Sequence, residues 1–313
     1  MGDNFLKIEE LLRQRADLNA RLNLLPYKGS VEVKTSGEKK YLYMRNRVGA
    51  RVTSTYVDVY SDLLYDNLLR YSAESKELKK QIRKIERELI KLGFAEEELS
   101  NEILRNIDFA KTNLKSNIYS QAILEGVATS FPQTEDIIEN GIVSGVTATD
   151  VQKILNLKHA WEFITDKDVI LSGTSYYVLC HIAKLVNEGF FADGGRIRGV
   201  PVTIGGTNYV PAIPDEIDVK AQIDNILNIN AEPIDIAIKL CLFVMKTQIF
   251  NDGNKRAAVI FANHYLISKG AGMLVIPESE VPNFKKLLIA YYEDKDNGKA
   301  EQFLKQKCYK KLN

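Results

Sequence analysis

The stretch that decides the fold is residues 247–258, which read Thr-Gln-Ile-Phe-Asn-Asp-Gly-Asn-Lys-Arg-Ala-Ala. An apolar segment at 236–245 precedes it and another at 257–267 follows it, and both predict buried helices. Asn-Asp-Gly at 251–253 is a turn signal, because glycine tolerates positive φ and Asp or Asn satisfies nearby backbone groups. We therefore expect the chain to leave one core helix, turn sharply and begin a second, with Asn-Lys-Arg at 254–256 in or near its first turn.

The start of that second helix has the chemistry of an anion site. The first N–H groups of a helix have no intrahelical acceptor, and the macrodipole adds partial positive charge there. Cations are unfavourable at this end of a helix alone, so Lys255 and Arg256 indicate a bound anion. Asp252 beside them could hold a divalent metal that bridges phosphate oxygens. The stretch predicts a loop for a metal-bound polyphosphate; the alternative is an ordinary helix–turn–helix with a solvated polar turn.

The same stretch resembles the signature of the Fic/Doc (Fido) family, His-x-Phe-x-Asp/Glu-Gly-Asn-Gly-Arg-x-x-Arg. Five positions match the signature: Phe250, Asp252, Gly253, Asn254 and Arg256. Three positions depart from it. Gln248 stands in place of the catalytic His, Lys255 in place of the second Gly, and Val259 in place of the second Arg.

The resemblance implies a protein adenylyltransferase-like activity. In that family the His removes the proton from a Ser, Thr or Tyr hydroxyl of a target protein, which attacks the α-phosphate of ATP and becomes an AMP ester. ATP and Mg²⁺ are the implied cofactors, with the metal on Asp252. The residues implied to hold the phosphates are Gly253, Asn254, Lys255 and Arg256, and Arg256 and Gln248 occupy catalytic positions.

Gln248 changes the expected chemistry. Its carboxamide can hydrogen-bond a hydroxyl but has no lone pair that titrates near neutral pH. Losing a positioned base typically costs a factor on the order of 100 to 10,000 in rate. Three interpretations stay open: a transferase of weak or redirected activity, a Fido pseudoenzyme that binds nucleotide or a partner, and an engineered replacement at Gln248. Asn-Lys-Arg at 254–256 also resembles Doc-like members, which are phosphotransferases that present the γ-phosphate.

Residues 120–130 resemble the inhibitory helix of Fic proteins, patterned Ser/Thr-x-x-x-Glu-Gly, through Glu125 and Gly126. In that family the Glu pairs with the second motif Arg and blocks the nucleotide γ-phosphate. Val259 occupies that Arg position here, so Glu125 is expected to lie unpaired at some cost or to turn to solvent. A core helix that ends at a glycine cap is the alternative.

Residues 200–213, bracketed by Gly and Pro, predict a β-hairpin. The segment resembles the Fic flap, which lies over the active site and aligns a target protein by adding a strand to it. An exposed strand edge binds such a segment through main-chain hydrogen bonds. Arg196 and Arg198 resemble the Gly-x-x-Arg approach to the flap. A hairpin without a partner is the alternative.

Residues 1–98 are predicted to form a separate N-terminal arm, and 99–313 the Fic domain. A helix at 4–23 and a charged helix at 62–92 should pair like a coiled coil, the second through the apolar seam Leu78, Ile82, Ile85 and Leu89. This apolar seam is short for dimerisation on its own, so the sequence leaves a homodimer formed through it open. The expected fold is mainly α: a Fic-type helical bundle with a β-hairpin flap, plus this helical arm carrying a small antiparallel sheet.

Three alternating segments between the arm helices, 30–35, 40–45 and 51–57, predict the sheet, with turns at 36–39 and 48–50. Lysines and arginines alternate with tyrosines along it. Such a surface could contact nucleic acid or an acidic protein partner. A solvated sheet with lysines that protect its edges is the alternative.

Composition limits the remaining function classes. The chain has 42 Lys and Arg against 41 Asp and Glu, which argues against a general nucleic-acid or membrane binder and leaves nucleic acid only to the arm. Three scattered cysteines indicate free thiols in a reducing compartment. The acidic start is not typical of a signal peptide, and no apolar run reaches the roughly 20 residues of a membrane span. We expect a cytoplasmic protein.

Overall fold

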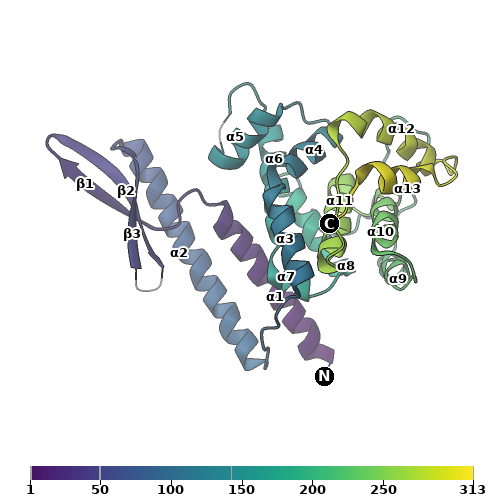
Figure 1. The fold of residues 1–313 in the computed structure, drawn as a ribbon, viewed down its shortest axis with the longest axis horizontal. Coiled ribbons are helices and arrows are strands. Elements are labelled where there is room, and N and C mark those ends of the chain that lie inside the picture. The colour runs from purple at the N-terminus through teal and green to yellow at the C-terminus, as the bar shows by residue number, and fades with distance from the viewer. Residues whose placement is uncertain (1, 49–50, 142, 313) are drawn as a thin grey trace. The chain divides into compact units, whose positions relative to one another are not determined.

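The computed structural model describes residues 2–48, 51–141 and 143–312, and it divides into two compact units, Met1–Ala95 and Glu96–Asn313. Figure 1 shows two long helices and a three-stranded sheet in the first unit and a mainly helical second unit. The mainly α fold predicted from the sequence is confirmed.

The first unit contains α1 (Gly2–Leu24), β1 (Ser30–Ser36), β2 (Lys39–Val48), β3 (Arg51–Val59) and α2 (Asp62–Lys91). The two helices pack through a small apolar cluster made of Leu11, Leu12, Ile85 and Leu89. Ser61 begins α2 by accepting a hydrogen bond from the backbone N–H of Leu64 on its side chain. The predicted pairing of an N-terminal helix with the charged helix is therefore confirmed.

The sheet of the first unit is an antiparallel meander in the order β1-β2-β3. Its register pairs Glu32 with Tyr43 and Tyr43 with Tyr56, and a bulge interrupts the β2–β3 ladder at Leu42/Tyr43. Leu42 and Met44 are buried against Leu68 of α2, so one face of the sheet is its core face. Of the predicted turn at 48–50, positions 49 and 50 lie outside the described residues.

The second unit is a bundle of helices. They are α3 (Asn101–Thr112), α4 (Leu114–Leu124), α5 (Phe131–Asn140), α6 (Ala148–Ile164), α7 (Lys167–Leu171), α8 (Tyr176–Val186), α9 (Glu216–Leu227), α10 (Pro233–Thr247), α11 (Asn254–Ser268), α12 (Val281–Tyr292) and α13 (Lys299–Phe303), with short helices η1 (Glu278–Glu280) and η2 (Leu304–Cys308). A two-stranded ladder joins β4 (Met273–Leu274) to β5 (Tyr309–Lys310).

Helix α11 is the centre of the bundle. All but two of its 15 residues are buried, and it packs against α10, α8 and α6. A helix that is buried on every side belongs to the interior of a large core. The consequence is that the start of α11 is held rigidly by its neighbours, which favours a precise binding site there.

The predicted β-hairpin at 200–213 is wrong. Residues 200–214 contain no strand, only a turn at Gly205–Gly206 within an irregular segment, which we call the flap segment. Pro201 and Pro211 have no N–H to donate to a ladder. The carbonyl groups of Pro211 and Ala212 accept hydrogen bonds from a side chain instead, as described below.

None of the helices in the described ranges combines the length and apolar character that crossing a bilayer requires.

Candidate functional site

The connection between α10 and α11 makes two left-handed turns. Gln248 caps α10 with φ 49° and ψ 61°, and its N–H donates to Val244 O over 3.2 Å. Gly253 caps the start of α11 with φ 73°. A side chain at Gly253 would also collide with Asn187, whose Oδ1 lies 2.8 Å from the place a Cβ would take. Only glycine fits this position, so the Asp-Gly turn expected from the sequence has a steric cause.

Asn254 holds this loop together. Its Oδ1 accepts the N–H of Phe250 over 2.9 Å, and its Nδ2 donates to Phe250 O over 2.7 Å and to Gln248 Oε1 over 3.1 Å. Gln248 Nε2 in turn donates to Met245 O over 2.6 Å. The Asn254 side chain is thus used within the loop, and its backbone N–H is the part of this residue that faces outward from the helix start.

Arg256 is almost fully buried, with 2 % of its side chain exposed. One terminal nitrogen donates to Val186 O over 2.7 Å, and the other donates to Asp252 Oδ2 over 2.9 Å. Its Nε makes no hydrogen bond and lies 3.5 Å from Glu125 Oε2. The structure therefore brings Arg256 and Asp252 into one charged group at the helix start, with one donor of the guanidinium still unsatisfied.

Glu125 does not turn to solvent, which corrects the sequence-based expectation. Its side chain is 13 % exposed and lies 3.5 Å from Arg256 Nε and 3.8 Å from Lys255 Nζ. The expected partner position, Val259, lies one turn further along α11. Lys255 and Arg256, one turn before Val259, pair with Glu125 instead.

The position of Glu125 follows from the way α4 ends. Gly126 has φ 78°, its N–H donates to Ile123 O, and the N–H of Val127 donates to Ala122 O. These two bonds form a Schellman cap, which usually needs glycine at the left-handed position. The cap places Glu125 at the end of α4, beside the start of α11. The glycine cap that the sequence offered as the alternative for this stretch is therefore present.

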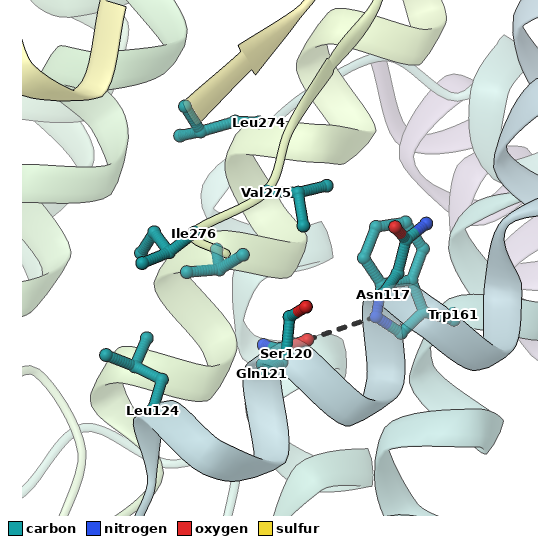
Figure 2. Close-up of a pocket in the computed structure, with 9 residues that line it drawn as sticks. Asn117, Ser120, Gln121, Leu124, Trp161, Leu274, Val275 and Ile276 are labelled. Atoms are coloured by element: carbon teal, nitrogen blue, oxygen red, sulfur yellow. Dashed lines mark hydrogen bonds between the residues drawn. The ribbon is translucent and has the colours of Figure 1, made fainter. Parts of the chain in front are cut away.

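Figure 2 shows a small cavity next to α4, with Asn117, Gln121 and Trp161 among the residues that line it. Trp161 Nε1 donates to Gln121 Oε1 over 3.0 Å (dashed line in Figure 2). Gln121 Nε2 donates to Arg256 O over 2.8 Å. A cavity of about 10 Å³ lies beside this pair, lined partly by Asn117 and Val259. That volume holds about one water molecule. The site therefore has no room at Val259 for a ligand group.

The open part of the site is a pocket of about 190 Å³ in front of the start of α11. It is lined by the loop from one side and by the flap segment from the other: Glu125, Val202, Thr203, Ile204, Gly205, Gln248, Asn251, Asp252, Gly253, Asn254, Lys255 and Tyr292. Every predicted site residue except Gly126 and Arg256 lines it, and Arg256 lies directly behind Asp252. The structure thus gathers the predicted residues around one cavity.

Arg198 fixes the flap segment over this pocket. The residue is 1% exposed, and its guanidinium donates to Val200 O, Pro211 O and Ala212 O, at the two ends of the segment. Arg196, by contrast, is exposed and 3.5 Å from Asp193. Burial lowers the pKa of the Arg198 guanidinium. The sequence identified both arginines but not their different roles.

Two residues that shape the site had no recognisable signal in the sequence. Asn187 Nδ2 donates to Asp252 O over 2.9 Å and so holds the turn from outside. Tyr292 lines the pocket from α12. Both are far from the loop in the chain, and neither occupies a position that the signature marks.

Among the described residues, no group of three or more His, Cys, Asp or Glu side chains could hold a metal by itself. Asp252 remains the one predicted metal ligand, with 51 % of its side chain exposed and one oxygen on Arg256. Mg²⁺ in nucleotide sites usually takes one or two carboxylates, substrate phosphates and water rather than a full protein cage. The donor set is compatible with a metal that arrives with a nucleotide.

The geometry defines a helical bundle with an open pocket at the start of a buried helix. Residues 174–266, from α8 to the end of α11, match the model of the Fic/DOC family. This part of the chain is a Fic/DOC domain, and members of that family typically transfer AMP or similar groups. Residues 6–66 match a domain of unknown function, DUF6788. No relative among curated proteins matches the chain.

Solved structures of Fic proteins have the same fold. A fragment of Fic-1 from C. elegans is 20% identical, with a TM-score of 0.53, over 78% of this chain and 74% of that chain. A Fic domain containing signaling protein from Bacteroides thetaiotaomicron is 19% identical, with a TM-score of 0.51, over 61% and 75%. A Fic family protein from Desulfovibrio desulfuricans is 15% identical, with a TM-score of 0.50, over 66% and 72%. At these identities the likeness concerns the fold.

Proposed function

We propose that this chain binds Mg–ATP at the start of α11 and transfers AMP from it to a Ser, Thr or Tyr hydroxyl of another protein. The bond between the α- and β-phosphates breaks and pyrophosphate leaves, and the transfer is slow because Gln248 replaces the base. The observation that carries the proposal is the pocket of about 190 Å³ onto which Gly253, Asn254 and Lys255 open. No side chain caps the start of α11, so its first N–H groups are available to an anion.

The residues present fit a nucleotide with its metal. Lys255 supplies a cation at the pocket wall, and the buried Nε of Arg256 is a donor without a hydrogen-bond partner. Asp252 would take the metal. Bound ATP supplies the electrophilic phosphorus, and the chain's own part is positioning and charge stabilisation, which dominate phosphoryl-transfer catalysis.

Gln248 limits the rate in this proposal. Its Oε1 already accepts from Asn254 and its Nε2 donates to Met245 O, so the carboxamide is fixed at the pocket wall. The oxygen retains a second lone pair that can orient a hydroxyl group. It cannot take up the proton, which has to leave to solvent or to the nucleotide.

The flap segment is proposed to align the target protein. It contains no strand, and Val200, Val210 and Ile213 are more than half exposed, at 54%, 62% and 52%. A target segment that pairs with this backbone would place its hydroxyl beside Gln248, by the strand addition that many peptide-binding proteins use.

Labelled ATP tests the proposal. The unaltered chain and Gln248→His are each incubated with a candidate target extract, magnesium and ATP labelled at the α-phosphate or at the γ-phosphate. We expect α-label transfer by both proteins and a rate roughly 100- to 10,000-fold higher with His. A chain that transfers no label in either form contradicts the proposed transfer.

Two other outcomes identify the alternatives. Transfer of the γ-label alone would identify a Doc-like phosphotransferase, which the Asn-Lys-Arg sequence at 254–256 favours. Binding of ATP without any transfer, even by Gln248→His, would identify a nucleotide- or partner-binding module, which Gln248 favours because its carboxamide has no group that titrates near neutral pH.

A further inference from the structure

The outward face of the sheet in the first unit carries a row of side chains that the core of that unit does not use. Along β2, Leu42 and Met44 are buried against Leu68. Side chains alternate between the two faces of a strand, so the odd-numbered residues of β2 lie on the opposite face. In order along the strand these are Lys39, Tyr41, Tyr43, Arg45 and Arg47.

A third tyrosine extends this row onto β3. Tyr56 lies opposite Tyr43 in the register, with ring centroids 5.5 Å apart, and 6.3 Å from the ring of Tyr41. Tyr56 is 50% exposed. Three adjacent rings on an outward face form a contiguous apolar surface, and such surfaces mark interaction sites more often than isolated exposed residues do.

The charge around the rings is positive. Residues 30–59 contain six Lys and Arg and three Asp and Glu, whereas the whole chain has a net charge of +1. One carboxylate on the face is already used: Glu32 accepts from Ser54 Oγ over 2.8 Å and lies 3.6 Å from Lys34. The Ser54 hydrogen bond, together with Lys34, lowers the pKa of Glu32.

Cations stand at both ends of the tyrosine group. Lys39 and Arg45 precede and follow the tyrosines of β2, and both are exposed. Lys34 Nζ lies 4.3 Å from the centroid of the Tyr43 ring. The face therefore combines stacking surfaces in the middle with positive charge around them.

We propose that this face binds single-stranded nucleic acid. Unpaired bases would stack on Tyr41, Tyr43 and Tyr56, while Lys39 and Arg45 contact the phosphates on either side. Aromatic rings on a sheet surrounded by cations are the common design of single-strand binders, because every base has a face to stack. An acidic peptide would use only the cations, and a duplex keeps its bases stacked inside, so neither would use the exposed rings.

Binding to the full-length chain tests the inference. Fluorescein-labelled 20-nucleotide single-stranded DNA and RNA of one sequence are titrated with protein, and anisotropy is recorded. Tyr56→Ala should weaken binding about 5- to 150-fold, the effect of losing one stacked base, and Tyr56→Phe should bind like the unaltered chain because it keeps the ring. Comparison of the DNA titration with the RNA titration shows which of the two nucleic acids the protein prefers.

A charge-matched pair of variants makes a second, independent test. Arg45→Gln and Lys80→Gln each remove one positive charge, but Lys80 lies on α2 with its side chain 80% exposed. Arg45→Gln should reduce the slope of log affinity against log salt by about 0.7, the value for one phosphate contact on a single strand. Lys80→Gln should leave that slope unchanged.

Three results would overturn the inference. They are no binding of either oligonucleotide by the unaltered chain, native affinity in Tyr56→Ala and Arg45→Gln, and binding of a duplex or of polyglutamate at least as tight as that of the single strands. Circular dichroism of each variant establishes that the sheet and helices are retained. None of these readouts depends on the proposed transfer of AMP.

Discussion

Arg198 Nε donates a hydrogen bond to the carbonyl oxygen of Gln248 over 2.5 Å. The same guanidinium donates to Val200 O over 2.7 Å and to Ala212 O over 2.5 Å. One buried cation therefore joins both ends of the flap segment to the turn that carries Gln248. Because the ordinary pKa of arginine is very high, the guanidinium stays charged although burial lowers its pKa.

Arg198→Lys should destabilise the protein. An ammonium group is a point donor and cannot span the three segments that the guanidinium joins, so buried carbonyls lose their partners at about 1–3 kcal/mol each. We expect the free energy of unfolding to fall by about 2–4 kcal/mol, measured by urea denaturation. The control is Arg196→Lys, at an exposed ion pair with Asp193, which should change stability by less than about 0.5 kcal/mol. Equal effects at the two positions would refute the role given to Arg198.

Local parts of the fold could be predicted from the sequence. Helices α10 and α11 follow from apolar periodicity, and the turn between them follows from Asp252 and Gly253, because these signals act over a few residues. The strands of the meander were accessible for the same reason, and the apolar seams of α1 and α2 indicated that these two helices pair. The loop that lines the pocket at the start of α11 was accessible because its residues are consecutive at 251–255.

The polar contacts between distant segments at the site could not be predicted. Glu125 had no expected partner once Val259 stood in place of Arg, yet the end of α4 lies where its carboxylate reaches Lys255 and Arg256. The hairpin predicted at 200–213 failed because Arg198 binds the carbonyl groups of that segment, a competition that strand propensity does not register.

Asp252→Ala should weaken the dependence of nucleotide binding on magnesium. In the proposed site Asp252 is the carboxylate available to the metal, so the unaltered chain should bind ATP at least about tenfold more tightly with magnesium than without it, a difference of about 1.4 kcal/mol. Titration calorimetry with and without Mg²⁺ measures this ratio, which should approach one in Asp252→Ala. Asp193→Ala, which removes an exposed carboxylate outside the pocket, is the control and should keep the ratio. Equal ATP affinity with and without magnesium in the unaltered chain would disprove the metal role.

Glu125→Gln should strengthen ATP binding. The carboxylate lines the pocket and pairs with Arg256 and Lys255, so it competes with a phosphate for the same cations. The amide keeps the shape of the side chain and removes the negative charge. An increase of about tenfold in affinity, or about 1.4 kcal/mol, is expected from the lost repulsion. Glu135→Gln, which removes the same charge at a half-buried pair with Lys115 outside the pocket, should leave the affinity unchanged. Unchanged or weaker binding in Glu125→Gln would show that Glu125 does not compete.

His264 predicts how stability depends on pH. Its Nδ1 lies 3.0 Å from Thr174 Oγ1 and its Nε2 lies 3.0 Å from Val169 O, so the neutral ring satisfies both contacts. Burial lowers its pKa to about 4, against an ordinary value of about 6.5. The unfolded chain therefore takes up a proton at a higher pH than the folded protein does. The stabilisation that comes from keeping the His264 ring neutral is fully present above about pH 6.5. It is lost as pH falls, and the loss reaches about 3 kcal/mol at about pH 4.

The variant His264→Gln isolates the effect of His264 on the free energy of unfolding, because the variant retains every other titrating group. The amide can still donate to Val169 O, so the fold is expected to survive at neutral pH at some loss of stability. The free energy of unfolding is measured by urea denaturation between pH 4 and pH 7.5 for both proteins. The unaltered chain should lose about 3 kcal/mol more than the variant between about pH 6.5 and pH 4. Parallel curves for the two proteins would mean that His264 takes up a proton equally readily in the folded and the unfolded chain.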